Sequence, residues 1–255
     1  HPHKENELAD IVLDEERRYA LSRMESGKNI FLTGKGGAGK SMLTRHFLQT
    51  TKRKILVMAS TGIAAINVGG QTAHSGFKIR PGMSLSAIKK SDHPSMEIFS
   101  HLDGVLIDEF SMLRADFLDM MDKVARLHGP NPNLPMGGLQ LIGVGDICQL
   151  PPVVTDEEGV YFQEHYPSPY FFDAHCYSSL AMEYIELDRV FRQKDPTLVN
   201  VLNKLRMGEA TQDDLDVLNV RVDPLFDLAN YHEHIYLATK NRVVDQINIE
   251  KLSVL

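Results

Sequence analysis

The sequence contains no tryptophan and only two cysteines, Cys148 and Cys176, among 255 residues. Two isolated cysteines form neither a disulfide framework nor a zinc site, which favours a reducing, intracellular compartment: the cytoplasm in a bacterium, or the nucleus or mitochondrion in a eukaryote. No apolar run approaches the roughly 20 residues that cross a bilayer, so we expect no membrane partner. No apolar segment follows His1-Pro2-His3-Lys4, as a signal peptide would require.

An excess of basic residues is also missing. Lysine and arginine number 27 against 34 acidic residues, which gives a formal net charge of −7. This charge balance argues against a surface that is positively charged throughout. It does not exclude a local nucleic-acid groove, because binding there depends only on the electrostatic potential at the contact surface. With 43% hydrophobic and 24% charged residues, the composition is that of an ordinary globular protein and indicates no function.

What the sequence does contain is a regular alternation of short apolar runs, glycine turns and helical patterns. This alternation predicts an α/β fold, in which a parallel sheet carries helices on both faces. The predicted strands cover residues 29–33, 54–58, 104–107 and 139–144. The predicted helices that follow the first two strands cover residues 40–48 and 61–66.

Loops rich in proline are predicted at 128–138 and 151–169. After residue 187 the alternation restarts, with helices predicted at 196–207, 211–220 and 241–252 and a strand at 235–238. We therefore predict an N-terminal helical segment at 1–29, a first domain at 30–187 with a small insertion at 77–103, and the beginning of a second domain at 188–255. The chain stops in an apolar, helix-like stretch, which suggests that it is a truncated piece.

The segment Gly34–Ser41 matches the P-loop pattern, and it lies between a predicted strand and a predicted helix. Its glycines allow successive backbone N–H groups to face a phosphate, and the following helix adds a favourable dipole. Lys40 would neutralise the β- and γ-phosphates of ATP, while Ser41 would offer a hydroxyl to Mg²⁺. A chance glycine-rich turn is the alternative. The expected nucleotide-binding residues are Gly34, Gly36, Gly37, Ala38, Gly39, Lys40, Ser41 and Met42.

A second motif is the apolar run Val105–Ile107, which ends in two carboxylates. Asp108 is expected to hold Mg²⁺ through water beside the P-loop, and Glu109 is expected to activate the attacking water. Alone the pattern is weak, because acidic residues often end strands. Together with the P-loop upstream, it predicts a hydrolytic nucleotide site.

The segment Gly145–Pro152 follows the last predicted strand of the first domain. Asp146 and Gln149 would then face the same crevice as the P-loop. Gln149 is a neutral hydrogen-bonding side chain, which suits a sensor of the γ-phosphate. A tight turn with capping residues is the alternative interpretation.

With these motifs, the sequence resembles the superfamily 1B DNA helicases of the PIF type, which are relatives of the RecD motor. The segments that carry the resemblance occur in the family's order, and Leu237–Asn248 is similar to part of the family's second motor domain. The segments in the first part of the chain are Gly34–Ser41, Ala59–Ala65, Gly69–Ser75, Ile107–Met112, Pro135–Gly138, Gly145–Val153 and Leu187–Gln193.

The resemblance implies a P-loop NTPase (RecA-like) fold, with a first RecA-like motor domain at 30–187 and the beginning of a second at 188–255. It also implies an ATP-dependent helicase that uses Mg²⁺ and moves 5′ to 3′ along single-stranded DNA. It implies single-stranded DNA and single-strand/double-strand junctions as partners, and we expect a monomer. Arg192 would act as an arginine finger: its guanidinium would reach the γ-phosphate of ATP from the opposite side of the nucleotide cleft and supply positive charge there. A solvated arginine is the alternative. The residues implied to line the DNA track are Thr61, Gly62, Thr72, His74 and Ser75, which could otherwise be loop residues that cap helices.

The sequence departs from the family in one place. Arg17 stands where members usually carry a glutamine that recognises adenine, so the resemblance does not extend to adenine selectivity. Two other function classes share the P-loop: a phosphotransferase, and a nucleotide-binding module without DNA-driven activity. Glu109 and Gln149 suit water as the acceptor, which favours the helicase.

Overall fold

The computed structural model describes residues 13–189, 195–224 and 237–253. Contacts between Cα atoms divide the chain into two compact units, residues 1–210 and residues 211–255. Within the described residues, no helix is long and apolar enough to cross a membrane. The predicted extent of the domains, with a boundary after residue 187, differs from this division because α9 (Pro196–Met207) belongs with the first unit.

A parallel sheet of six strands forms the first unit, in the order β3-β2-β4-β5-β1-β6. Neighbouring strands of this sheet pair in parallel, as in Ile30↔Ile142 between β1 and β5 and Leu106↔Ile142 between β4 and β5. The strands are β1 (Ile30–Gly34), β2 (Ile55–Ala59), β3 (Gln71–Thr72), β4 (Gly104–Asp108), β5 (Gln140–Val144) and β6 (Glu183–Leu187). The predicted α/β fold is thereby confirmed, because parallel strands need helical crossovers and are covered on both faces.

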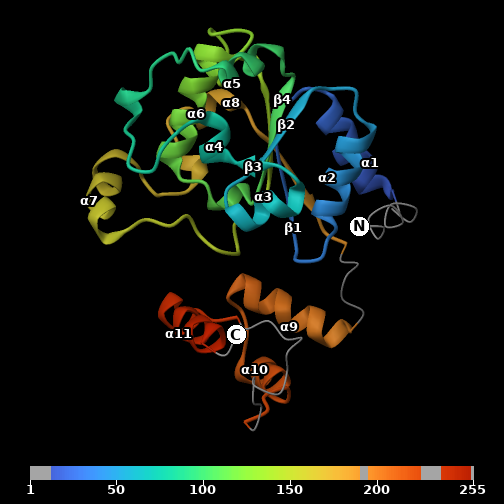
Figure 1. Cartoon of the computed structure of the whole chain (residues 1–255). Coiled ribbons are helices and arrows are strands. Elements are labelled where there is room, and N and C mark those ends of the chain that lie inside the picture. The colour runs from blue at the N-terminus through green and yellow to red at the C-terminus, as the bar shows by residue number, and fades with distance from the viewer. Residues whose placement is uncertain (1–12, 190–194, 225–236, 254–255) are drawn as a thin grey trace. The chain divides into compact units, whose positions relative to one another are not determined.

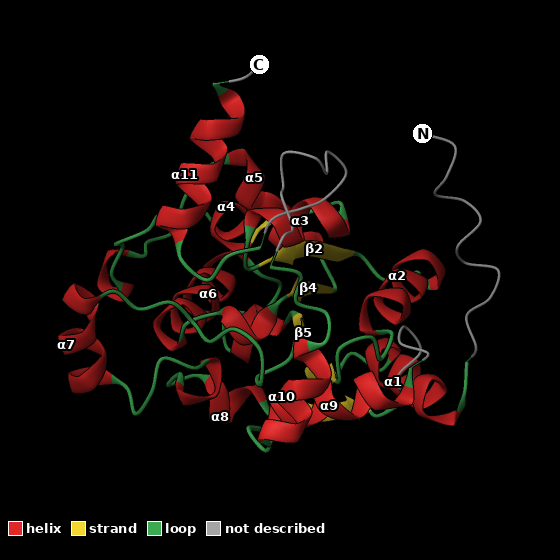
Figure 2. Cartoon of the chain, turned by 90° about the horizontal axis from the view of Figure 1, so that it is seen from below, coloured by secondary structure: helices red, strands yellow, loops and turns green. Residues whose placement is uncertain are grey.

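Helices cover both faces of this sheet (Figure 1). Helices α1 and α2 lie on one side, and α4, α6 and α8 lie on the other, an arrangement that Figure 2 shows again from below. The helices of the first unit, besides α9, are α1 (Glu15–Glu25), α2 (Lys40–Thr50), α3 (Gly62–Val68), α4 (Ala73–Phe77), α5 (Pro94–Glu97), α6 (Ala115–His128), α7 (Asp156–His165) and α8 (Tyr177–Leu180).

The two faces of the sheet contribute to two separate hydrophobic cores. Ile30 and Leu32 of β1 pack in the core under α1 and α2, whereas Phe31 between them packs in the core under α6. Successive side chains of a strand point to opposite faces, so a continuous apolar strand supplies both cores at once. The apolar runs that predicted the strands are explained by this double burial.

Helix α6 carries three buried carboxylates at three-residue spacing, Asp116, Asp119 and Asp122. They bind loop backbone and neighbouring side chains: Asp119 accepts hydrogen bonds from the Tyr166 hydroxyl at 2.9 Å and the Cys176 N–H at 2.9 Å. Asp122 accepts a hydrogen bond from the buried Met136 N–H at 2.6 Å. A buried carboxylate is tolerated when its oxygens are hydrogen-bonded, so Asp119 and Asp122 attach neighbouring irregular segments to α6.

Two expectations about secondary structure were wrong or incomplete. Residues 151–169 are not loop throughout, because they contain α7, which Thr155 and Glu158 begin with a reciprocal capping box. The strands β3 and β6 were not predicted, since β3 spans only Gln71–Thr72 and β6 alternates polar and apolar residues at the sheet edge. The irregular segment predicted at 128–138 contains the short 3₁₀ helix η4 (Pro135–Gly138).

The second unit contains α10 (Gln212–Asn219) and α11 (Asn241–Leu252). Thr211 caps α10 and accepts a hydrogen bond from the Asp214 N–H, and the Asp214 side chain accepts one from the Thr211 N–H in return. The predicted helices at 211–220 and 241–252 are confirmed. The predicted strand at 235–238 lies partly outside the described residues, and Leu237 and Ala238 are not in a strand. That 188–255 begins a second motor domain stays a prediction.

Candidate nucleotide and DNA site

The predicted P-loop connects β1 to α2. Gly37 and Gly39 have positive φ angles of 80° and 88°, a region that favours glycine, and Gly39 is the N-cap residue of α2. Lys40 opens α2, and its Nζ donates hydrogen bonds to the carbonyls of Gly34 at 2.6 Å and Lys35 at 3.3 Å. Ser41 and Met42 follow on the exposed side of the first turn. The loop thus presents backbone N–H groups, a helix N-terminus and an ammonium group together.

Gly34 ends β1 and allows a close approach of the neighbouring strand. A Cβ on residue 34 would stand 2.3 Å from the carbonyl oxygen of Leu187 in β6, and φ at Gly34 is +139°. Any side chain there would push β6 away from the start of the P-loop. The first P-loop glycine is therefore required by sheet packing as well as by the loop.

The two carboxylates of the second motif lie at the end of β4. Asp108 ends the strand, and Glu109 follows with a φ angle of +51°, in the left-handed region that non-glycine residues rarely adopt. Such a backbone costs about 1 kcal/mol or more and tends to persist at functional sites. Burial raises the pKa of both carboxyl groups, and the neighbouring Asp108 charge raises the pKa of Glu109 further. A raised pKa suits a general base.

The loop after β5 carries the third motif and is organised around Asp146, which is 1% exposed. The Asp146 N–H donates to Ser111 Oγ at 3.2 Å, and the Asp146 carboxylate accepts from the Cys148 N–H at 3.0 Å and from Gln149 Nε2 at 3.1 Å. The segment is thus a turn with capping hydrogen bonds, which is the alternative interpretation, while a role for Gln149 as a γ-phosphate sensor stays a prediction.

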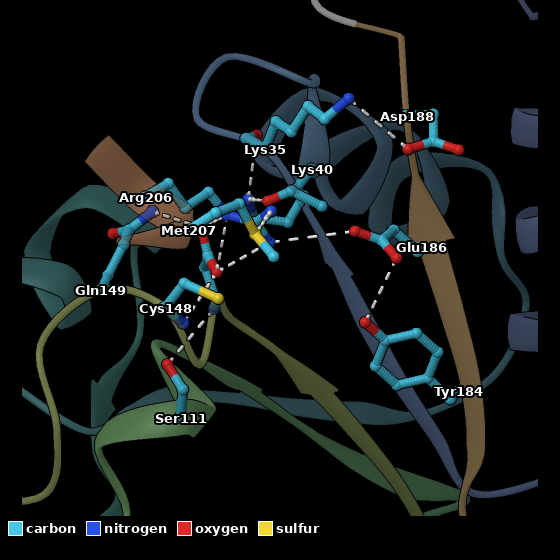
Figure 3. Close-up of polar contacts among 12 residues, drawn as sticks. Lys35, Lys40, Ser111, Cys148, Gln149, Tyr184, Glu186, Asp188, Arg206 and Met207 are labelled. Atoms are coloured by element: carbon cyan, nitrogen blue, oxygen red, sulfur yellow. Dashed lines mark hydrogen bonds and ion pairs between the residues drawn. The ribbon is translucent and has the colours of Figure 1, made fainter. Parts of the chain in front are cut away.

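The order of the strands brings the three motifs together. Strand β5 lies between β1 and β4, so the Asp146 loop emerges between the P-loop and the Asp108–Glu109 pair. Burial and the charge of Arg206 lower the pKa of Lys40, while the negative charges of Asp146, Glu109 and Asp108 act to raise it. Figure 3 shows Lys40 and Gln149 at this meeting point, with Arg206 between them.

The donor set suits Mg²⁺ bound together with a nucleotide. Ser41 and Asp108 offer a hydroxyl and a carboxylate, the hard oxygen ligands that Mg²⁺ prefers. Among the described residues there is no cluster of three or more histidine, cysteine, aspartate or glutamate side chains that could hold a metal alone. Mg²⁺ characteristically completes its shell with phosphate oxygens and water, so this sparse set fits such an ion.

Arg17, which stands at the family's glutamine position, is 3% exposed. Its guanidinium donates to the Asp14 carboxylate at 2.6 Å and to the carbonyls of Ala38 at 2.5 Å and Arg189 at 3.3 Å. The side chain therefore connects α1 with the P-loop and with the segment after β6. A guanidinium has donors only, so it cannot copy the donor–acceptor pair of a glutamine.

The candidate DNA residues lie on α3, β3 and α4, along one edge of the sheet. Thr61 and Thr72 are N-cap residues, whose hydroxyls accept from the N–H groups of Ala64 and Ser75. The structure brings Thr61 and His74 to one pocket of ≈ 550 Å³, which Arg80 and Arg114 also line. His74 is half-buried, and its ring stacks on Phe117 with centroids 4.1 Å apart.

Gly62 and Ser75 are exposed, whereas Thr72 is partly buried and lines neither that pocket nor the open groove of ≈ 900 Å³ beside it. Ser75 lines this second groove with His74 and Lys78. The helix-capping interpretation of the two threonines is thus seen directly, while a DNA track along this edge stays a prediction.

One predicted residue and one unpredicted residue complete the description. Arg192, the expected arginine finger, lies outside the described residues. Arg206 was not predicted, yet it binds Asp146 although the two are 60 residues apart. No local pattern marks it, because it lies within an ordinary amphipathic helix that ends in Lys204 and Arg206.

Comparison with known proteins gives a consistent result over most of the chain. The sequence model of the PIF1-like helicase family matches residues 12–212. The chain is similar to the ATP-dependent DNA helicase PIF1 of Saccharomyces cerevisiae, with 35% identity over 208 residues that cover 78% of this chain and 23% of that protein. It is also similar to the yeast ATP-dependent DNA helicase RRM3, with 31% identity over 96% of this chain and 34% of that protein.

Solved structures agree with the sequence comparison. The crystal structure of Pif1 helicase from Bacteroides in complex with ADP-AlF3 and ssDNA superposes with a TM-score of 0.87 at 34% identity, covering 96% of this chain and 58% of that one. The chain spans about a quarter of the length of the PIF1 helicases of Saccharomyces cerevisiae and Candida albicans. A structure of forked dsDNA unwinding describes two coordinating Pif1 helicases, so a monomeric state stays a prediction for this chain.

Proposed function

This chain belongs to the PIF1-like helicase family, and we propose that it forms the nucleotide-hydrolysing part of an ATP-dependent DNA helicase. The observation that carries the proposal is the meeting of the P-loop, the Asp108–Glu109 pair and the Asp146 loop at the ends of three neighbouring strands, β1, β4 and β5. Each motif supplies a different requirement of phosphoryl transfer, and only the parallel sheet order places them together.

In this proposal the P-loop N–H groups and Lys40 hold the β- and γ-phosphates of ATP. Ser41 and Asp108 hold Mg²⁺, which neutralises phosphate charge when bound. Glu109 accepts a proton from the attacking water, whose oxygen forms the new bond to the γ-phosphorus. The bond to the β–γ bridging oxygen breaks, and ADP and phosphate are the products. Gln149 senses the γ-phosphate through a hydrogen bond, and Arg192 supplies positive charge as bond breaking proceeds.

The coupled work is translocation along single-stranded DNA in the 5′-to-3′ direction and unwinding at a junction. Thr61, His74 and Ser75 support a track along α3 and α4, because hydroxyls, backbone amides and an aromatic ring can hold a strand without reading its sequence. The Bacteroides helicase with ssDNA and ADP-AlF3 is consistent with this assignment.

The test is phosphate release from ATP and Mg²⁺, with and without single-stranded DNA. We expect hydrolysis that DNA stimulates and that Lys40→Ala abolishes. If nucleotide binds without turnover or DNA response, a longer form of the chain should restore both. Failure of the longer form as well would rule out the helicase and favour a nucleotide-binding module or a phosphotransferase. Unwinding of a duplex with a 5′ tail, compared with a 3′ tail, tests the polarity.

A further inference from the structure

A buried ion pair connects α9 with the nucleotide site. Arg206 lies in the last turn of α9, and its Nε donates to both carboxylate oxygens of Asp146, at 3.0 and 3.2 Å. Its Nη2 donates to the same carboxylate at 3.1 Å and lies 3.8 Å from Glu186. The Arg206 side chain is 14% exposed and that of Asp146 is 1% exposed. Figure 3 shows Arg206 reaching into the site beside Lys40 and Gln149.

The ion pair with Arg206 stabilises the charged form of the buried Asp146 carboxylate. Burial by itself would raise the pKa of Asp146, but hydrogen bonds from Arg206, Cys148 and Gln149 hold that pKa below its ordinary value. Two parallel N–H donors on one carboxylate also fix its orientation, which a point charge would not do. Asp146 is therefore held both charged and oriented by a residue outside the sheet.

The oriented carboxylate in turn orients the predicted sensor. Gln149 Nε2 donates to Asp146 Oδ2 at 3.1 Å, and the Cys148 N–H donates to Oδ1 at 3.0 Å. These two bonds fix the backbone and the amide of the Gly145–Gln149 loop on the Asp146 oxygens. A chain of contacts thus runs from α9 through Asp146 to Gln149.

We propose that Arg206 is a positioning residue, which sets Gln149 to distinguish a nucleoside triphosphate from a diphosphate by neutralising and orienting Asp146. The inference rests on the proposed function, because it concerns the same nucleotide site. It assigns a second arginine to that site in addition to the predicted Arg192, and it gives Arg206 an indirect role through a carboxylate. The third guanidinium nitrogen of Arg206, Nη1, lies 4.0 Å from Met207 Sδ, which is a weak contact. The shorter hydrogen bonds of Arg206 are those to Asp146.

The test compares the affinities of ATPγS and ADP, which requires no turnover. Displacement of a fluorescent ADP analogue from the 255-residue chain with Mg²⁺ gives both dissociation constants. We expect the wild-type chain to prefer ATPγS. Arg206→Met should reduce that preference about tenfold, the size expected for losing a charged hydrogen bond, while ADP affinity changes less than about threefold. Arg18→Met, at an exposed arginine of α1, is the matched control and should change neither constant.

A second pair of variants separates positioning from direct phosphate binding. Arg206→Met combined with Asp146→Asn leaves no unpaired buried charge, and this double variant should regain most of the preference for ATPγS. Arg206→Lys restores charge without the two-donor geometry and should fall between wild type and Arg206→Met.

Several outcomes would overturn the inference. One is an unchanged preference for ATPγS in Arg206→Met, and another is an equal loss of ATPγS and ADP binding in that variant. A third is a double variant as impaired as Arg206→Met alone, which would mean that Arg206 binds phosphate itself. Equal affinity of the wild type for both nucleotides would also overturn it. If the wild type bound neither nucleotide, the proposed function itself would fail.

Discussion

The Arg17 guanidinium donates a 2.5 Å hydrogen bond to the carbonyl of Ala38 in the middle of the P-loop. Through its other contacts, to Asp14 and to the carbonyl of Arg189, the same side chain connects α1 with the segment beyond β6. Arg17, which by the family resemblance stands where a glutamine is expected, thus supports the backbone of the predicted phosphate-binding loop. The guanidinium of Arg17 donates its hydrogen bonds to two backbone carbonyls and to the Asp14 carboxylate.

This relationship predicts a loss of affinity without a change of base preference. Arg17→Ala should weaken ATP and GTP binding by the same factor, about tenfold, because a charged hydrogen bond to the P-loop is lost. Titration of both nucleotides against the chain measures the two factors. A change of more than about threefold in the ATP-to-GTP ratio would instead assign base recognition to Arg17. Arg18→Met serves again as the control.

The position of Glu109 predicts a variant that binds nucleotide but does not hydrolyse it. Glu109→Gln keeps the shape and the backbone of the residue but removes the base, so phosphate release should fall about a hundredfold or more. ATP affinity should stay within a few-fold of wild type, since Lys40 and the P-loop are untouched. Single-turnover phosphate release and equilibrium binding separate the two effects. Glu97→Gln, on the exposed side of α5, should leave both unchanged.

The stacking of His74 on Phe117 predicts a contribution to single-stranded DNA binding. His74→Ala should weaken the affinity for an oligothymidylate about fivefold, as expected for the loss of one aromatic contact of roughly 1 kcal/mol. Fluorescence anisotropy at a fixed salt concentration measures it. His46→Ala, which changes a histidine of α2 on the opposite side of the sheet, is the comparison. Equal affinities for both variants would remove His74 from the proposed track.

The Pro135–Gly138 turn predicts a strong effect on stability. A Cβ on Gly137 would lie 2.0 Å from the carbonyl oxygen of Ala125 at the end of α6. Met136 shows that a positive φ alone is tolerated here, so the clash decides the outcome. Gly137→Ala should lower the free energy of unfolding by about 2 kcal/mol or more, as urea denaturation would show. Gly159→Ala, in open space on α7, should be neutral or stabilising by up to about 1 kcal/mol.

The contact between Glu158 and Arg114 predicts a pH dependence of stability. A 2.6 Å hydrogen bond from Arg114, with help from the Thr155 N–H, lowers the pKa of Glu158 to about 2. Because the pKa is lowered in the folded state, this stabilisation is present above the unfolded pKa near 4.5 and is lost as the pH falls towards 2.

Glu158→Gln should therefore destabilise the chain at pH 7, by about 1 kcal/mol after allowance for solvent screening, and have little effect near pH 2. Urea denaturation at the two pH values measures the difference. Glu157→Gln, at the exposed neighbour, controls for the loss of charge. A difference that stays constant with pH would show that the Glu158 carboxylate does not act as a charged partner of Arg114.

The sequence by itself determined the fold class and which residues make up most of the candidate nucleotide site. Apolar runs such as Val105–Ile107 predict buried parallel strands because every residue of such a strand faces a core. The P-loop glycines, Lys40 and the Asp108–Glu109 pair are predictable because their chemistry depends on local spacing along one strand–loop–helix unit. Their meeting at one edge follows from the rule that parallel strands present their carboxyl ends together.

Only the tertiary structure decided the contacts between residues far apart in the chain. Arg206 joins Asp146 across 60 residues, and Arg17 reaches Ala38 across 21. Neither pairing leaves a periodic signal, because a guanidinium on a helix has the same local pattern whether it meets water or a buried carboxylate. The edge strand β6 was missed for a related reason, since its pairing with β1 depends on Gly34 allowing the Leu187 backbone to approach. The local pattern specifies which groups can do chemistry, and the packing of distant segments decides what holds them in place.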